Sequence, residues 1–237
     1  MLVLWTIALL TLMTLSYHRA VRAEIRNTTR TVGAAQTRAI ATAGIWVGVR
    51  ELLDRAARAR PAATPLDTSF ADAEVRLRFQ DQEGLIDLNA AGADLIEAAA
   101  IAARIEPGAA HKLAAAIVAY RTPATSGNAT EPVPLGTIEE LRDVPGVTAD
   151  LYVALKPFVT VHSGRYGIDP QVAPPALARA ASVSQQIQTS RRLYAIVSEA
   201  RTRTATQRIA AIVRLGGPPS QPVAVYAWQE DPEIEEP

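Results

Sequence analysis

The first 17 residues are apolar and carry no charge, reading MLVLWTIALLTLMTLSY. As a helix rising about 1.5 Å per residue, this segment would be roughly 25 Å long, slightly shorter than the hydrocarbon core of a bilayer. Arg19 and Arg22 follow directly, with no small-residue cleavage site, so we expect a retained membrane anchor rather than a signal peptide. The alternative is an N-terminal helix buried in a protein core. The expected anchor side chains are Leu2, Leu4, Trp5, Ile7, Leu9, Leu10, Leu12 and Leu15.

A helical pattern continues from residue 18 to residue 60. Apolar residues recur at steps of three, four or seven positions, and no proline occurs before Pro61. The sequence therefore predicts one long helix, whose second half, residues 18–60, is amphipathic and packs on a sheet. The apolar side of this helix consists of Val21, Ile25, Val32, Ala35, Ala39, Ala43, Trp46, Val49 and Leu53. Within it, Ala39, Ala43 and Trp46 combine small residues with one aromatic side chain, and we expect them to contact a partner protein. Part of the same apolar side must also pack on the protein's own sheet, and the sequence does not divide its residues between the two contacts.

The rest of the chain separates into strand-like and helix-like regions. Residues 61–83 form the first strand region, because positions 74–80 alternate between apolar and polar residues. Residues 84–190 are alanine-rich and predict an all-helical domain. Residues 191–229 return to strand patterns with short connections, which predicts an antiparallel meander. Residues 230–237 form an acidic tail.

Individual elements follow from the same patterns. The helical domain is expected to hold helices at 93–105, 109–120, 138–144 and 149–156, with an exposed loop at 122–136. The C-terminal strands are expected at 193–199, 208–214 and 222–228.

Two segments of the helical domain resemble helix-hairpin-helix units. The first turn is read at Glu106-Pro107-Gly108 and the second at Val144–Val147. A DNA-binding hairpin of this kind presents backbone N–H groups to a phosphate and has two glycines one residue apart. Ala110 and Thr148 replace the second glycine here, and carboxylates flank both turns. The sequence therefore favours hairpins that serve as packing units over hairpins that bind DNA.

Composition narrows the functional classes further. The chain has 24 basic and 24 acidic residues and no cysteine, which excludes a strongly basic nucleic-acid binder, a disulfide scaffold and a thiol nucleophile. His18, His111 and His162 share no metal-ligand spacing, and no catalytic constellation is present. We therefore expect no enzymatic activity and no cofactor. Asp81, Glu83 and Asp87 are weak candidates for a calcium site, because their spacing matches no standard loop.

Several short motifs occur in a fixed order along the chain. They are Leu4-Trp5, Leu9-Leu10, Glu24-Ile25-Arg26, residues 81–90 (DQEGLIDLNA), Ala119-Tyr120-Arg121, residues 137–141 (TIEEL), residues 144–148 (VPGVT), Leu155-Lys156-Pro157, residues 159–161 and residues 223–228. In this order they resemble the minor pseudopilin K family of type II secretion systems (GspK-like proteins), over nearly the whole chain.

The resemblance implies a fold, a position in the secretion system and partner proteins. The fold would be α+β, a pilin-like long N-terminal helix on an antiparallel sheet, with an inserted helical domain that contains the two hairpin units. The protein would sit at the pseudopilus tip beside minor pseudopilins I and J, anchored in the bacterial inner membrane with a periplasmic head, and would promote protein export. The first acid is Glu24, so the anchor lacks the glutamate of ordinary pilins, which suits a subunit with no neighbour above it.

Two features depart from the family pattern. The apolar stretch begins at residue 1, so we expect the reading frame to start upstream with a short basic leader that ends in glycine. The loop after Arg121 lacks the acidic residues usual in the family, which argues against a metal site there.

The alternatives to a pseudopilin are a membrane-anchored DNA receptor that uses the hairpin units and a membrane-tethered enzyme, for which the sequence offers no site.

Overall fold

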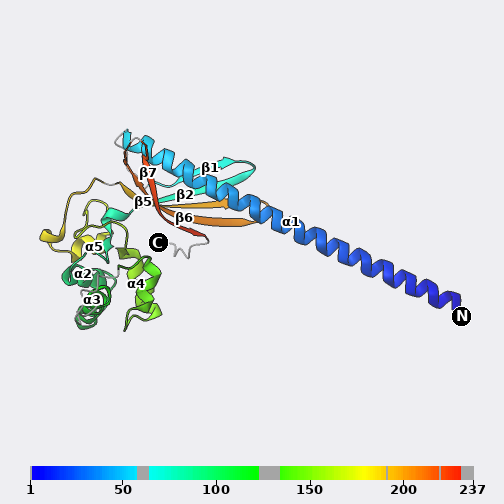
Figure 1. Cartoon of the computed structure of the whole chain (residues 1–237), viewed down its shortest axis with the longest axis horizontal. Coiled ribbons are helices and arrows are strands. Elements are labelled where there is room, and N and C mark those ends of the chain that lie inside the picture. Colours follow the sequence, from blue (N-terminus) through cyan, green and yellow to red (C-terminus); the bar gives the residue numbers. More distant parts are fainter. Residues whose placement is uncertain (1, 58–63, 123–133, 191, 219, 231–237) are drawn as a thin grey trace. The chain divides into compact units, whose positions relative to one another are not determined.

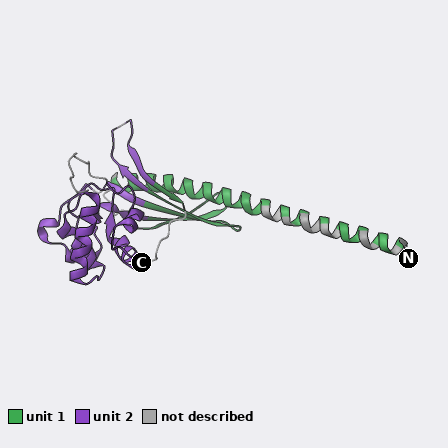
Figure 2. Ribbon diagram, turned by 60° about the horizontal axis from the view of Figure 1, so that its bottom comes forward, with its two compact units in different colours: residues 1–78, 196–211, 228–237 green, residues 79–195, 212–227 purple. Residues whose placement is uncertain are grey.

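The computed structural model describes residues 2–57, 64–122, 134–190, 192–218 and 220–230. The chain divides into two compact units (Figure 2). Unit 1 comprises residues 1–78, 196–211 and 228–237, and unit 2 comprises residues 79–195 and 212–227. Most of the expected loop at 122–136 and all of the acidic tail except Glu230 lie outside the described residues.

The largest elements of the fold are one long helix and one sheet (Figure 1). Helix α1 spans Leu2–Ala57 without interruption, as the absence of proline predicts. The sheet is antiparallel and has the strand order β1-β2-β5-β6-β7. Its strands are β1 (Leu66–Phe70), β2 (Ala73–Asp81), β5 (Leu193–Arg201), β6 (Thr206–Leu215) and β7 (Val223–Glu230). The expected fold class and the C-terminal meander are confirmed, and β1 is a strand that sequence reasoning missed.

Small residues let α1 approach its own sheet closely. A side-chain carbon added to Gly44 would lie 2.1 Å from Ser198 Oγ and 3.1 Å from Val75 Cγ1. One added to Gly33 would lie 2.6 Å from Thr204 Oγ1. Thr37, four residues after Gly33, is buried and lies 2.9 Å from Thr202, oxygen to oxygen. The contact between helix and sheet therefore depends on a row of small residues at helical spacing.

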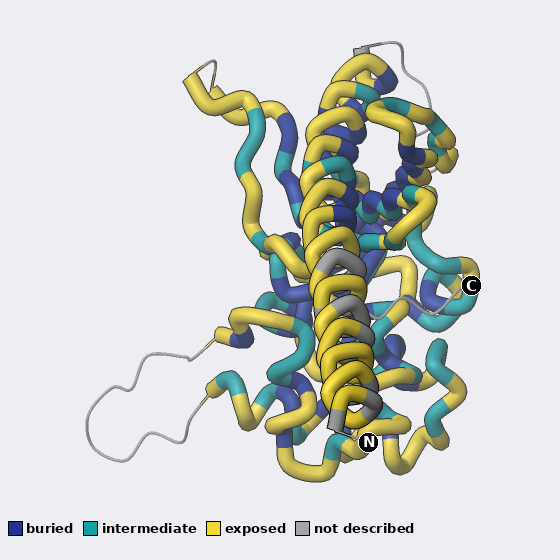
Figure 3. Tube along the Cα trace, turned by 90° about the vertical axis from the view of Figure 1, so that its right-hand side faces the viewer, coloured by how far each residue is buried: buried dark blue, intermediate teal, exposed yellow. Residues whose placement is uncertain are grey.

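The side of α1 that faces the sheet differs from the expected apolar side. Val49 is buried, but Val32, Trp46 and Leu53 are 51%, 52% and 40% exposed. The buried row is instead Gly33, Thr37, Ala41, Gly44, Ile45, Gly48, Val49 and Leu52. The sequence left open which of these apolar residues pack on the sheet. The structure buries Val49 and leaves Val32, Trp46 and Leu53 exposed, because the small residues on the opposite side of α1 allow the closer approach to the sheet. Figure 3 shows buried positions along one side of α1 and exposed positions along the other.

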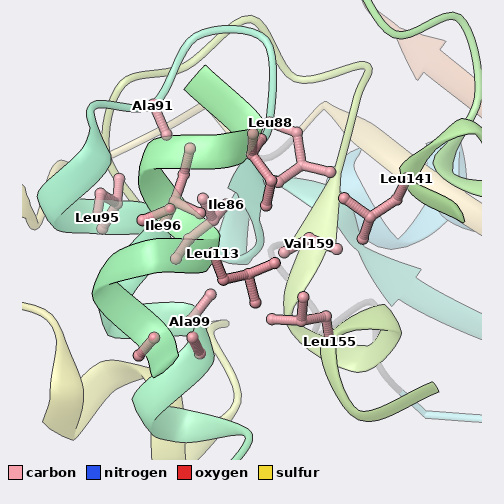
Figure 4. Packing of buried hydrophobic residues seen from close by; sticks show 14 of the residues in the cluster. Ile86, Leu88, Ala91, Leu95, Ile96, Ala99, Leu113, Leu141, Leu155 and Val159 are labelled. Atoms are coloured by element: carbon pink, nitrogen blue, oxygen red, sulfur yellow. The ribbon is translucent and has the colours of Figure 1, made fainter. Parts of the chain in front are cut away.

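Unit 2 holds a helical core. Its helices are α2 (Ala93–Ala102), α3 (Pro107–Arg121), α4 (Ala149–Leu155) and α5 (Pro175–Ala180), and the expected helix at 138–144 is a 3₁₀ helix, η2 (Ile138–Asp143). Shorter 3₁₀ turns are η1 (Gln82–Gly84), η3 (Lys156–Phe158) and η4 (Val183–Gln185). Two short strands, β3 (Ile86–Asp87) and β4 (Val159–Thr160), pair in parallel. Figure 4 shows the buried cluster on which these elements converge, including Ile86, Leu88, Leu95, Ile96, Leu113, Leu141 and Leu155.

The two hairpin turns share one backbone pattern. Arg104 (φ 64°) and Gly146 (φ 89°) each stand two residues before a helix N-cap, Glu106 and Thr148 respectively. The equivalent of Gly146 in the first turn is therefore Arg104, whereas Gly108 lies in the first turn of α3. The expected position of the first turn is wrong by about one helical turn, because the Pro-Gly pair marks a helix start rather than the turn itself.

Within the residues that the structure describes, none of the helices combines the length and the apolar character that crossing a membrane requires.

We predict that Gly44→Leu destabilises the protein. Replacing a helical glycine by leucine would by itself favour the helix by about 1 kcal/mol. The new side chain would instead press on Ser198 and Val75, and overpacking of this kind typically costs about 1–3 kcal/mol. Thermal unfolding followed by circular dichroism measures the effect. Ala43→Leu, one residue earlier and exposed, is the matched control, and equal melting temperatures for the two variants would contradict the proposed packing.

Candidate functional site: the exposed apolar face of the long helix

An apolar stripe runs along the side of α1 that faces away from the sheet. We call it the outer stripe. Its members are Val32, Ala35, Ala39, Ala43, Trp46 and Leu53. At 3.6 residues per turn these positions fall within an arc of about 80° on the helix surface. All six are exposed, so the structure places the three expected partner-contact residues, Ala39, Ala43 and Trp46, together on one accessible face.

The shape of the outer stripe follows from its side chains. Over two turns the side chains on this face are small, at Ala35, Ala39 and Ala43, and small side chains would let another helix approach closely. Trp46 stands at the end of this surface and is 52% exposed. Arg50, also exposed, interrupts the stripe before Leu53. The stripe thus combines a flat apolar surface, a large aromatic side chain and one positive charge, the composition expected of an interface centre with a polar border.

An open groove adjoins the N-terminal end of the outer stripe. It lies between α1 and the connection from β5 to β6, and its lining includes Glu24, Thr28, Val32, Gln36 and Thr204. Val32 belongs to both the groove and the stripe, so the accessible apolar surface continues toward the N-terminus of α1.

The described anchor residues are also exposed. Trp5, Ile7, Leu10 and Leu12 have exposed fractions between 55% and 75%. The side chains of Leu2, Leu4, Leu9 and Leu15 lie outside the described residues. No part of the described fold covers this end of α1, so the alternative of a helix buried in the chain's own core does not apply to the four described residues.

The expected calcium candidates serve the folding of unit 2. Asp87 is buried, and its carboxylate accepts hydrogen bonds from the backbone N–H groups of Asn89, Ala90 and Gly164 at 2.7–3.2 Å and from the Ser163 hydroxyl at 3.2 Å. Asp81 accepts from the Glu83 N–H group at 2.9 Å and caps η1. Across the described residues, no three acidic or histidine side chains are grouped so that they could hold a metal ion.

Asn89 belongs to the same group of buried hydrogen bonds as Asp87, which we call the Asp87 junction. Its side-chain amide donates to the carbonyl groups of Leu135 and Val161, at 2.9 and 3.2 Å, and accepts from the Leu135 N–H group at 2.8 Å. The Asp-Leu-Asn motif therefore ties three distant segments of unit 2 together. Arg121 adds hydrogen bonds to the carbonyl groups of Leu88 and Ala91, and burial lowers the pKa of its guanidinium against the opposing effect of Asp87.

Both hairpin turns have acceptors of their own at the helix N-terminus. The Glu106 carboxylate accepts from the Ala109 N–H group at 3.1 Å, and the Thr148 hydroxyl accepts from the Leu151 N–H group at 3.3 Å. A phosphate at the first turn would have to replace a carboxylate of the same charge sign. Ala110, the residue in place of the second glycine, is fully buried in α3. The geometry of the first hairpin thus suits packing better than phosphate binding.

The histidines are not brought together. His111 hydrogen-bonds Glu97 at 3.0 Å, whereas the ring of His162 lies 6.2 Å from that of Tyr226. Burial lowers the pKa of His162 below its usual 6.5, although Asp87 and Glu139 act in the opposite direction. The side chain of His18 lies outside the described residues.

Comparison with known proteins places the fold. No protein-family model matches the chain, and no curated protein matches its sequence. Among solved structures, it is similar to a chain in the crystal structure of the GspK–GspI–GspJ complex from the type 2 secretion system of enterotoxigenic Escherichia coli. The match has a TM-score of 0.59 at 14% identity and covers 90% of this chain and 99% of that chain. The protein therefore has a GspK-like, pilin-like fold.

We predict that His162 makes the stability of the protein sensitive to acid. Its folded-state pKa is lowered, so the unfolded chain binds the proton more readily and stability falls as the pH drops through about 6.5. His162→Gln should therefore flatten the dependence of the unfolding midpoint on pH between about 7.5 and 5.5. Urea unfolding at several pH values measures this, and an unchanged slope in the variant would refute the prediction.

Proposed function

We propose that the protein is a minor pseudopilin of a type II secretion system and acts as a tip subunit of the pseudopilus, where it promotes protein export across the outer membrane. It works by assembly rather than by catalysis. The observation that carries this proposal is the outer stripe, an accessible apolar helix face on a pilin-like fold. Its partners are minor pseudopilins of the I and J types, the proteins that accompany GspK in the complex of similar fold.

The outer stripe supports assembly through simple packing energetics. Burial of exposed apolar side chains favours the free energy of association by about 25 cal/mol per Å² of surface removed from water. Alanines at helical spacing let a second helix come close, and Trp46 supplies the large apolar surface typical of an energetic hot spot. Because the opposite side of α1 is occupied by the sheet, the outer stripe is the side of this helix that remains for a partner.

A tip position also suits the charge pattern of α1. Ordinary pilins, which the chain resembles, hold a neighbour through a glutamate in the apolar segment, and residues 1–17 contain no acid. A subunit without that pair has to be secured by contacts farther along the helix. We propose that residues 1–17 associate with the bacterial inner membrane, that the chain from about Arg26 onward forms the periplasmic head and that residues 84–190 are its inserted helical domain.

We predict that the protein forms a stable complex with its cognate I-type and J-type pseudopilins. Light scattering of the mixed heads, at about ten micromolar, should report a mass above that of any single component, since interfaces of this class reach micromolar affinity or better. A head that stays monomeric with both partners would contradict the proposal.

A charge placed on the outer stripe should prevent this assembly. Ala43→Glu would bury an unpaired carboxylate at the interface, and Trp46→Ala would remove the aromatic anchor, which typically costs 2 kcal/mol or more, a loss in affinity of about 30-fold. Ala56→Glu introduces the same charge on α1 outside the stripe and should bind normally. Titration calorimetry compares the three variants, and equal losses for Ala43→Glu and Ala56→Glu would argue against the stripe as the interface.

We predict that the protein does not bind duplex DNA. The Glu106 carboxylate occupies the position where the first hairpin would have to receive a phosphate. Titration at about 50 mM salt favours any electrostatic contact and is therefore the most permissive test. A complex of micromolar affinity or tighter would instead favour the DNA-receptor alternative.

A further inference from the structure

The charge of the chain is strongly divided. Residues 1–50 contain six arginines and a single acid, Glu24, which gives them a net charge of +5. Since the whole chain has a net charge of zero, residues 51–237 carry −5. The net positive charge is therefore confined to residues 1–50, and most of it lies in the segment that follows the apolar residues.

Four of these arginines form what we call the basic stripe, Arg19, Arg22, Arg26 and Arg30. Their spacing of three and four residues on a continuous helix places them within an arc of about 80°. By the same geometry they lie on the side of α1 that carries Gly33, Thr37 and Gly44, roughly opposite the outer stripe. The basic stripe and the outer stripe can thus serve two different contacts.

The sheet does not reach the basic stripe. Every described side chain between Val3 and Val32 is exposed, including those of Arg22 and Arg30, and the buried row begins at Gly33. At Gly33 the connection between β5 and β6 meets the helix through Thr204. The adjacent Arg203 is exposed too, and it adds a positive charge where the stripe ends. Two acids stand in this region, Glu24 on α1 and Asp72 beside Arg203, so arginine remains in excess.

We infer that the basic stripe binds the headgroups of anionic phospholipids. The four arginines follow an apolar segment that ends at residue 17, so the first of them would stand at headgroup depth when this segment lies in lipid. Each arginine near an anionic membrane surface adds an attraction that decays within about a Debye length, roughly 10 Å at 0.1 M salt. This inference rests on the membrane association proposed above, but it assigns the contact to lipid charge rather than to apolar insertion.

Vesicle flotation of the full chain tests the inference. The protein is diluted from detergent into vesicles of phosphatidylcholine, or of phosphatidylcholine with about 30% phosphatidylglycerol, and the bound fraction is titrated against lipid. We expect the anionic vesicles to bind at least about tenfold more tightly at about 50 mM salt, with most of this preference lost at about 500 mM salt.

Two matched triple variants separate the stripe from net charge. Arg22→Gln, Arg26→Gln and Arg30→Gln together leave only Arg19 of the stripe and should remove most of the preference for anionic vesicles. Arg76→Gln, Arg104→Gln and Arg179→Gln remove the same charge at exposed positions outside both stripes and should retain it. Equal binding of the wild type to both vesicle types would overturn the inference, as would a preference that survives in the first variant. Binding of duplex DNA through the same three arginines would also overturn it, by identifying a different polyanion as the ligand.

The same measurements distinguish this inference from the proposed function. Assembly with the I-type and J-type partners is measured with heads in the absence of lipid. If lipid preference is lost in the first triple variant while assembly persists, both proposals stand. If assembly fails while the anionic preference persists, only the proposed function falls.

Discussion

The close approach of α1 to its sheet determines what the rest of the molecule can do. Gly33 and Gly44 leave no space for a side chain at the contact, and Thr37 and Ala41 are buried between them. Because this row faces the sheet, the alanines and Trp46 on the opposite side must face outward. The same contact also defines where the helix leaves the sheet, and hence where Arg22 and Arg30, the described side chains of the basic stripe, become accessible. One packing contact thus determines both proposed binding surfaces.

Unit 2 is stabilised by a different interaction, the buried Asp87 junction. A carboxylate in the protein interior is costly unless it is hydrogen-bonded, and Asp87 accepts bonds from three backbone N–H groups and one hydroxyl. Together with Asn89 it fixes segments more than 40 residues apart in sequence. The Asp-Leu-Asn motif at residues 87–89 therefore has a clear structural role. The carboxylate of Glu106, which caps the helix after the first hairpin turn, likewise has a structural role.

The sequence predicts which segments form helices and strands better than it predicts which side of each element is buried. The long helix followed from periodicity and the absence of proline, and the last three strands followed from their apolar content. Strand β1 was missed because LDTSF is short and half polar. The sequence left open which side of α1 packs on the sheet, because both of its sides carry apolar or small residues. The spacing of Gly33, Thr37, Ala41, Gly44 and Gly48 was the signal that could have revealed it. No sequence rule anticipates that Arg104 takes the left-handed conformation that Gly146 takes in the second turn.

Contact between the outer stripe and partner pseudopilins can be tested directly, because the chain contains no cysteine. A single cysteine at Ala43 or, as the control, at Ala56 can carry a photoactivatable cross-linker into the assembled complex. If the outer stripe is the interface, position 43 yields a cross-linked product with an I-type or J-type subunit and position 56 yields little. Cross-linking from position 56 alone, or equally from both positions, would contradict it.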